Sequence, residues 1–248
     1  MISVCIATFN GEKYIEKQLT SILSQIAEND EVVICDDGSN DRTISLIENF
    51  TDIRIQLHNN PIRLGHVKNF EAALSRARGD YIFLSDQDDV WLPGRVERML
   101  SFVEGESSAW LVASNFDLID ENGVLTGEFR GLRSVKSSKT SQLFSILAGS
   151  APYYGCTFLL KKEALKYCLP IPDNIESHDI WIAMVVSCLG RVVNIWQPTL
   201  QHRIHGTNMT VKNRRRLWII LRSRFSFLVS LVFRLFAIKS GRFNFLSL

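Results

Sequence analysis

The sequence has few cysteines, and they follow no pattern typical of a disulfide framework or a thiol redox pair. The five are odd in number, and no two have C-x-x-C spacing: Cys5, Cys35, Cys156, Cys168 and Cys188. Two of them lie inside strand-like apolar runs, where a thiol behaves as a small apolar side chain. The pattern predicts a reduced, cytosolic compartment.

Other absences narrow the class of protein. Met1 runs straight into an apolar segment without a basic region or cleavage site, so we expect no signal peptide. F-N-G-E-K at 9 to 13 offers one glycine, not a glycine-rich phosphate loop with lysine, which argues against a nucleotidyltransferase. The longest uncharged run in the last part of the chain, Phe225 to Phe233, is nine residues, short of the ~20 that span a bilayer. We find no internal repeat.

What is present suffices for one large domain and an appendage. With 248 residues, 46% of them hydrophobic, the chain can bury a full core. Residues 212 to 248 hold nine Lys or Arg and no acid, which leaves 19 of the 28 basic residues against all 26 acidic ones in residues 1 to 211. We therefore predict an acidic domain over 1 to 211 and a basic tail over 212 to 248.

Residues 1 to 105 alternate between strand and helix patterns, which predicts a parallel sheet covered by helices on both faces. The expected strands are 2 to 7, 31 to 35, 53 to 57 and 81 to 84, and the expected helices are 13 to 25, 42 to 50, 67 to 77 and 94 to 103. The alternation then loosens. Further strands are expected at 110 to 119 and 156 to 160, a helix at 179 to 188, and a polar stretch at 123 to 141.

Carboxylates follow two of the expected strands. Asp86, Asp88 and Asp89 end the run Y-I-F-L-S-D-Q-D-D-V-W-L, and Asp36 and Asp37 end V-V-I-C-D-D. Acids this close repel one another unless a cation shares them, which predicts a hard divalent metal, although a solvated turn is the simpler alternative. Because ligands gather at the carboxyl ends of parallel strands, we expect one shared site for a nucleotide-linked substrate and its metal.

Six segments in order closely resemble the family 2 inverting glycosyltransferases of the GT-A fold, and especially the rhamnosyltransferase-like members that build bacterial surface polysaccharides. The segments are I-S-V-C-I-A-T-F-N (2 to 10), V-V-I-C-D-D-G-S-N-D-R-T (32 to 43), N-P-I-R-L-G-H-V-K-N-F (60 to 70), G-D-Y-I-F-L-S-D-Q-D-D-V-W (79 to 91), S-H-D-I-W (177 to 181) and R-I-H-G-T-N (203 to 208). The resemblance covers roughly residues 1 to 210. It implies an α/β fold with a Rossmann-like, mostly parallel sheet, in which about 1 to 105 binds nucleotide and about 106 to 211 faces the acceptor.

The resemblance also implies which residues bind the donor, a dTDP- or UDP-sugar. Asp86 and Asp88 match the D-x-D pair, one acid contacting the ribose side of the nucleotide and the other the Mn²⁺ or Mg²⁺, with Asp89 helping in either task. The other implied nucleotide-sugar ligands are Thr8, Asn10, Asp36, Asp37, Asn69 and Gly155. A second interpretation stays open for D-D-G-S, as an Asx-turn whose carboxylate caps the helix that begins near Asp41 and Thr43.

A basic cluster, Q-H-R-I-H-G-T-N, comes late in the chain. A neutral imidazole can complete a metal shell, and Arg203 can hold phosphate oxygens. The resemblance favours His205 over His202 as the metal ligand. The alternative is a surface loop with incidental basic residues.

Catalysis requires a base, because the attacking acceptor hydroxyl must lose a proton. Asp179 in S-H-D-I-W matches the catalytic carboxylate of the family. On its pattern alone it is an acid favoured at a helix N-terminus. Many members have Glu-Asp where this chain has His178 and Asp179, and Glu176 is an alternative base.

The tail combines apolar bulk with arginines and suits an interfacial helix on an anionic membrane surface; the alternative is a helix packed on the acidic domain. We expect a metal-dependent inverting hexosyltransferase, with rhamnose as the leading sugar, that extends a surface polysaccharide or a lipid-linked oligosaccharide. It would act at the cytoplasmic face of a bacterial cell membrane, with no nucleic acid partner. An inactive membrane-docked scaffold, a nucleotidyltransferase and a phosphoacceptor signalling domain are the alternatives.

Overall fold

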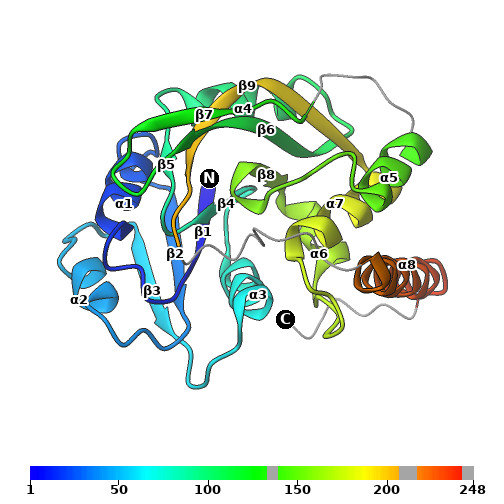
Figure 1. Ribbon diagram of the computed structural model, residues 1–248, viewed down its shortest axis with the longest axis horizontal. Coiled ribbons are helices and arrows are strands. Elements are labelled where there is room, and N and C mark those ends of the chain that lie inside the picture. Colours follow the sequence, from blue (N-terminus) through cyan, green and yellow to red (C-terminus); the bar gives the residue numbers. More distant parts are fainter. Residues whose placement is uncertain (133–138, 207–216, 242–248) are drawn as a thin grey trace.

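The computed structural model describes residues 1–132, 139–206 and 217–241, and a curved sheet forms its centre (Figure 1). The described strands are ordered β3-β2-β1-β4-β8-β6-β9-β5, and β7 pairs with β6 outside this path. The strands are β1 (Ile2–Thr8), β2 (Glu31–Asp36), β3 (Ile55–Asn59), β4 (Tyr81–Asp86), β5 (Val90–Trp91), β6 (Ala109–Ile119), β7 (Leu125–Phe129), β8 (Phe158–Lys161) and β9 (Arg191–Arg203).

Six strands point their carboxyl ends toward one edge of the sheet. β1 pairs in parallel with both β2 and β4, and β2 pairs in parallel with β3. β8 is antiparallel to both β4 and β6, so β6 runs in the direction of β4, and β9 is parallel to β6. β5 pairs with β9 through Val90 and Gln201, which places the turn after β4 beside the end of β9. We call this the carboxyl edge.

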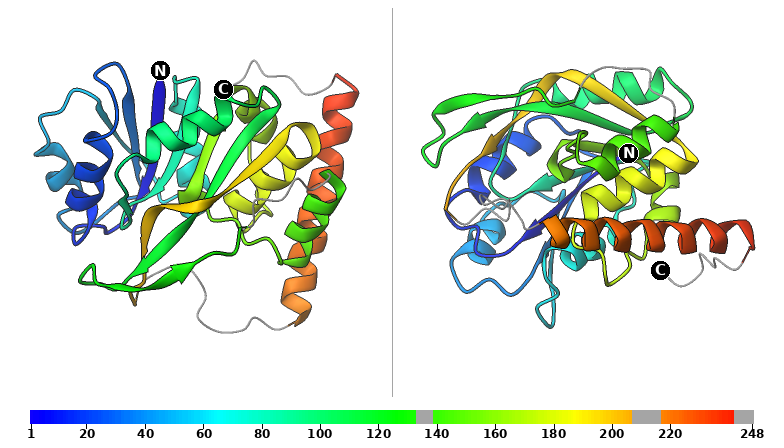
Figure 2. Two further views of the ribbon diagram at one scale, coloured as in Figure 1. Left: turned by 90° about the horizontal axis from the view of Figure 1, so that it is seen from above. Right: turned by 45° about the vertical axis from the view of Figure 1, so that its right-hand side comes forward.

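Helices cover both faces of the sheet (Figures 1 and 2). Side chains alternate along β1, so that Val4 and Ile6 join the core beneath α1, α2 and α4, while Cys5 joins the core beneath α3, α5, α6, α7 and α8. The helices are α1 (Ile15–Leu23), α2 (Thr43–Glu48), α3 (His66–Arg76), α4 (Arg95–Glu104), α5 (Lys139–Ala148), α6 (Lys162–Cys168), α7 (His178–Leu189) and α8 (Leu217–Lys239), with a 3₁₀ turn, η1, at Gly155–Thr157.

The predicted α/β class and the alternation over residues 1 to 105 are confirmed. Each strand and helix expected there is present, and β6, β8 and α7 are found where the later patterns placed them. The polar stretch 123 to 141 instead contains β7 and the start of α5, and the 13-residue strand β9 was not predicted. β9 is stabilised by pairing with the distant strand β6, which local periodicity does not reveal, whereas β7 forms a hairpin with β6 directly before it.

Helix α8 accounts for most of the predicted tail, of which residues 212–216 and 242–248 lie outside the described part. One face packs on the domain, because Phe227 and Leu231 are each 2% exposed and belong to the core around α7. The alternative of a helix packed on the domain therefore holds for this face. Among the described residues, no helix combines the length and the apolar character needed to cross a membrane.

Candidate active site

Asp36 ties together the carboxyl ends of β1 and β2. Its buried carboxylate accepts a hydrogen bond from the Thr8 hydroxyl at 2.8 Å and, through its other oxygen, from the backbone N–H groups of Gly38 and Ser39 at 3.0 and 2.8 Å. This is the Asx-turn expected for D-D-G-S, and Gly38 in it has a φ of +81°, which glycine adopts without steric cost. Thr8 and Asp36 thus shape the nucleotide side of the edge, and their contact with a base stays a prediction.

Asp37 does not cap a helix as the second interpretation proposed. Its carboxylate accepts hydrogen bonds from the backbone N–H groups of Leu64 and Gly65 at 2.6 and 2.8 Å, and so fixes the loop before α3. Asp41 serves the start of α2 instead, by accepting a hydrogen bond from the Thr43 N–H at 3.0 Å. The sequence pattern could not separate these acids, because Asp37 finds its partners 27 and 28 residues away.

Two amides border the same region. Asn69 is 2% exposed and donates through Nδ2 to the Thr8 carbonyl at 3.2 Å, so it braces α3 against the end of β1. Asn10 is exposed, with a φ of +51°, and its side-chain oxygen accepts a hydrogen bond from the Asn40 N–H at 2.8 Å. Asn10 is thus better placed than Asn69 to meet a ligand directly.

The three acids after β4 have different environments. Asp88 Oδ2 lies 2.7 Å from His205 Nε2, whereas Asp89 is fully buried and its Oδ1 lies 2.8 Å from His202 Nδ1. Asp86, the last residue of β4, is half-buried, and its pKa is raised by burial and then by the charges of Asp89 and Asp88. Asp89 therefore has an ion-pair partner in His202, and its supporting role toward a ligand stays a prediction.

The pair of Asp89 and His202 is charged. Burial acts to lower the pKa of His202, but the nearby Asp89 carboxylate and the charge of Asp86 outweigh it and raise that pKa to about 9. The pKa of Asp89 is correspondingly lowered, although burial opposes this. His202 is thus protonated at neutral pH, which leaves His205 as the imidazole available to a metal.

Among the described residues, one group of side chains brings its ligand atoms close enough to share a cation, and it differs from the predicted set. Ligand atoms of Asp86, Asp89, Cys156 and His202 lie within 4.8 Å of one another. The proton on His202 and the raised pKa of the buried Cys156 thiol oppose metal binding there. The predicted set, Asp86, Asp88 and His205, offers two carboxylates and an imidazole whose nitrogen is already 2.7 Å from a carboxylate oxygen. That donor chemistry fits Mn²⁺ or Mg²⁺.

Arg203 is turned into the protein. Its side chain is 1% exposed, with Nε donating to the Asp88 carbonyl at 2.8 Å and Nη1 to the Asp120 carbonyl at 2.9 Å. Its backbone N–H donates to Asp89 at 3.1 Å. These contacts fix the conformation of the turn that contains Asp88 and Asp89. A phosphate contact by Arg203 stays a prediction.

Asp179 lies in the first turn of α7 and is half-buried. It accepts hydrogen bonds from the Ser177 hydroxyl and, at 2.7 Å, from the Ile180 N–H. Burial raises its pKa above the usual value, and its own charge adds to the raised pKa of Asp86, so the two carboxyl groups are neighbours. The alternative base, Glu176, is exposed and accepts a hydrogen bond from Ser223 of α8 at 3.3 Å.

Gly155 begins η1 and lies beside Asp179. A Cβ built on it would lie 2.6 Å from His178 Nε2, so the imidazole occupies the space that any other side chain would need. The Gly155 backbone N–H is also among the groups that hold down the pKa of Asp179. The close approach explains the need for glycine, while its predicted sugar contact is not decided by this geometry.

Two side chains that the sequence did not single out, Gln87 and Tyr14, complete the arrangement. Gln87, between the two acids of D-x-D, accepts a hydrogen bond from the Phe9 N–H at 2.9 Å and donates to the Phe9 carbonyl at 3.1 Å. The Tyr14 ring packs against His205 at 5.1 Å and lies under the Arg203 guanidinium at 4.6 Å. Only the position of Gln87 inside a motif could have indicated its role.

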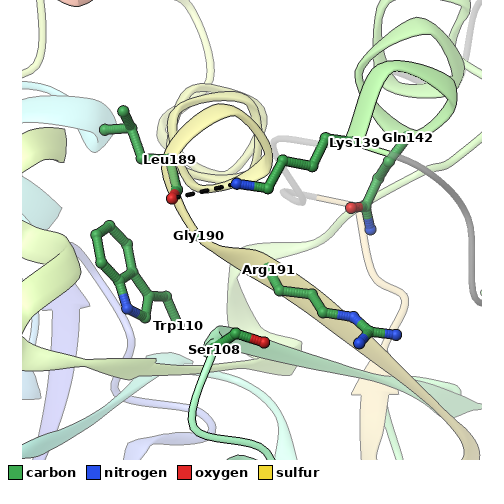
Figure 3. A pocket seen from close by; sticks show the side chains of 7 residues that line it. All are labelled: Ser108, Trp110, Lys139, Gln142, Leu189, Gly190 and Arg191. Carbon is green, nitrogen blue, oxygen red and sulfur yellow. Dashed lines mark hydrogen bonds between the residues drawn. The ribbon is translucent and has the colours of Figure 1, made fainter.

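A cavity of about 320 Å³ lies apart from these residues (Figure 3). Lys139 reaches across it to donate to the Leu189 carbonyl at 3.3 Å. Its lining comes from the amino ends of β6 and β9 and from α5 and α7: Ser108, Trp110, Lys139, Gln142, Leu189, Gly190 and Arg191. None of the predicted site residues lines it.

Comparisons with known proteins agree with this fold. The glycosyl transferase family 2 profile matches residues 3–169. The chain is 34% identical over 218 residues to UDP-Glc:alpha-D-GlcNAc-diphosphoundecaprenol beta-1,3-glucosyltransferase WfaP of Escherichia coli, covering 88% of this chain and 82% of WfaP.

Solved structures share the fold at low sequence identity. S. aureus TarS 1-349 in complex with UDP-GlcNAc has a TM-score of 0.70 at 18% identity and matches 92% of this chain. The mannosyltransferase PcManGT of Pyrobaculum calidifontis, in complex with GDP-Man and Mn²⁺, has a TM-score of 0.60 at 19% identity and matches 81%. The chain spans only 66% of the TarS chain and 56% of the PcManGT chain. With the family profile matched over most of the GT-A-like domain, the chain belongs to glycosyl transferase family 2.

Proposed function

We propose that the protein is a metal-dependent, inverting hexosyltransferase that moves a sugar from a nucleoside-diphosphate sugar to a lipid-linked or surface saccharide. One observation carries the proposal: the pair of Asp88 and His205 and the half-buried Asp179 meet at the carboxyl edge of a family 2 chain. A UDP-hexose is the first donor to test, because WfaP is named for UDP-Glc and TarS was solved with UDP-GlcNAc. dTDP-rhamnose is the second, from the sequence resemblance.

Each group has a chemical task in this reaction. Asp179 takes the proton from the acceptor hydroxyl, and its raised pKa makes it a stronger base than an exposed aspartate while shifting the acid limb of activity toward neutral pH. Asp86, Asp88 and His205 would hold Mn²⁺ or Mg²⁺, whose positive charge stabilises the departing diphosphate when bound. Thr8, Asn10 and the loops held by Asp36 and Asp37 form the nucleotide side.

Calorimetric titration of UDP, dTDP and GDP, with Mn²⁺ and then with chelator, tests the nucleotide site. We expect binding of one pyrimidine diphosphate that needs the metal. An Asp179→Asn variant should keep that affinity and lose transfer by about 10²- to 10⁴-fold, whereas Glu176→Gln, the matched control, should transfer normally. Binding of none of the three nucleotides would refute the proposed function, and full activity of Asp179→Asn would refute the assignment of the base.

Helix α8 supports a place for this reaction at a membrane. Opposite its packed face it carries a stripe of large apolar side chains that are 42% to 69% exposed: Trp218, Leu221, Phe225, Leu228, Val232, Phe233 and Phe236. Most of them recur at intervals of three or four residues, so they share one face along the helix. α8 lies at the edge of the molecule (Figure 2).

We assign this stripe to an anionic lipid surface. α8 contains no acidic residue, and the exposed Arg222 and Lys239 flank the stripe near its two ends. Aromatic and aliphatic side chains bordered by basic ones suit the acyl boundary and anionic headgroups. The acceptor in the name of WfaP, a diphosphoundecaprenol-linked GlcNAc, is itself lipid-linked. A peripheral site on the cytoplasmic face of the membrane would bring the carboxyl edge to such an acceptor.

Vesicle sedimentation tests the membrane proposal. Phe225→Glu combined with Val232→Glu should weaken binding to phosphatidylglycerol vesicles at least tenfold, since burying one large apolar side chain is worth roughly 1.5–3 kcal/mol. The control introduces the same charges at Ile53 and Val124, which are 92% and 61% exposed and lie outside α8. Equal binding by the two double variants would show that α8 does not contact lipid.

A further inference from the structure

His66, the first residue of α3, is held in a defined position beside the candidate site. Its ring packs edge-on against Phe70 at 5.1 Å and against His178 at 5.0 Å. These two rings are 0% and 3% exposed and stack on each other at 4.2 Å. Asp37 fixes the preceding loop through the Gly65 N–H at 2.8 Å, so both the backbone and the ring of His66 have a fixed support.

The imidazole lies near both the proposed base and the proposed metal ligand. His178, on which it rests, directly precedes Asp179 in α7. Burial lowers the pKa of His66, and the charges of Asp179 and Asp88 both act to raise it, so both carboxylates are near. A sugar in transfer must lie in the same region, near Asp179 and Asp88, because its anomeric carbon lies between the acceptor and base on one side and the metal-bound diphosphate on the other.

The ring nitrogens of His66 are available to a ligand. In the part of the chain that the structure describes, His66 makes ring contacts but no hydrogen bond or ion pair, and the residue keeps part of its surface open to solvent although the rings of Phe70 and His178 cover one side of the imidazole. A neutral imidazole donates one hydrogen bond and accepts another. A hydroxyl group, which also does both, is the ligand chemistry that matches it.

We propose that His66 binds the sugar being transferred and helps determine donor specificity, with one ring nitrogen hydrogen-bonded to a hydroxyl of that sugar. A donor that bears this hydroxyl is accepted, and the analogue deoxygenated at that position is disfavoured. The inference rests on the proposed glycosyl transfer and adds to it a residue that selects among sugars attached to the same nucleotide.

The test compares His66→Phe, which keeps the ring packing but has no ring nitrogen, with His66→Gln, which restores a polar group of similar reach. The assay measures kcat/KM with the UDP-hexose that the wild type uses and with each of its monodeoxy analogues, together with the affinity for UDP alone. We expect His66→Phe to lower kcat/KM for the complete sugar by about tenfold, with no loss on one monodeoxy donor and unchanged UDP affinity. His66→Gln should recover part of the loss.

Other outcomes would overturn the proposal. An equal loss on every donor would mean that His66 only supports the packing of His178, and no loss at all would mean that it does not touch the sugar. If the unfolding midpoint of His66→Phe falls, His66→Phe no longer separates a sugar contact from lost packing. The kcat/KM values of His66→Gln with the complete and the monodeoxy donors are then used instead. If the wild type transfers sugar normally and both variants keep its donor preference, this inference alone is refuted. If the wild type does not bind UDP, the proposed function is refuted as well.

Discussion

Replacing His202 with Gln should remove a pH dependence of stability that the wild type has between pH 6.5 and about 9. His202 is 6% exposed, and its Nδ1 lies 2.8 Å from the fully buried Asp89 carboxylate. Burial lowers the pKa of the imidazole, but Asp89 and Asp86 overcome this and raise it from 6.5 to about 9. The folded protein therefore keeps a proton that the unfolded chain releases at lower pH.

The difference between the pKa of His202 in the folded and in the unfolded state gives the sign and the size of the change in stability with pH. Where the folded state binds more protons, stability falls as pH rises, so the contribution of His202 is complete below pH 6.5 and disappears toward pH 9. Each unit of pKa corresponds to about 1.4 kcal/mol, which gives a loss of about 3 kcal/mol over this range. The lowered pKa of Asp89 describes the same ion pair from its other side and does not add to that figure.

Urea unfolding across this pH range, in the presence of chelator, measures the effect as the difference between wild type and His202→Gln, because the groups that do not interact with His202 cancel; Asp89 and Asp86, whose pKa values His202 lowers, do not. His58→Gln is the control: burial lowers the pKa of His58, so its removal should affect stability at lower pH and with the opposite sign. Parallel stability curves for wild type and His202→Gln would refute the charged pair and, with it, the argument that His205 is the histidine available to a metal.

Three further changes test other contacts. Gly155→Ala should cost about 1–3 kcal/mol of stability in thermal unfolding and reduce transfer, because the new Cβ meets His178, whereas Gly206→Ala, where a Cβ meets no atom of the described residues within 4 Å, should be neutral. Arg234→Met should cost about 3 kcal/mol in urea unfolding and expose α8 to proteolysis, because the guanidinium donates to three backbone carbonyls. Asp88→Asn should weaken metal-dependent UDP binding more than about tenfold in calorimetry.

Much of the fold follows from local pattern. The alternation over residues 1 to 105 predicts the four longer strands and the four helices found there, because burying a strand or a helix face requires a repeating apolar pattern in the sequence; the two-residue strand β5 was not predicted. β9 was not predicted, since a strand that pairs with a segment far away in the sequence needs no strong local signal. β7 was not predicted although it pairs with β6, which directly precedes it.

The residues of the candidate site could be predicted from the sequence, but the contacts that pair them could not. Asp86, Asp88, Asp179 and His205 could be named from motifs. The division of tasks between Asp88 and Asp89 depends on two histidines more than 110 residues away in the chain. The inward orientation of Arg203 depends likewise on carbonyls of a loop 82 to 83 residues away.

The sequence by itself determined the α/β class, the acidic ends of the strands, the family and the basic apolar character of the last segment, because each is a property of neighbouring residues and their spacing. Only the tertiary structure decided which acid pairs with which histidine, that His66 rests beside Asp179, and which face of α8 is packed and which is open. These outcomes depend on side chains brought together from distant parts of the chain, where burial and charge act over a few ångströms regardless of separation in sequence.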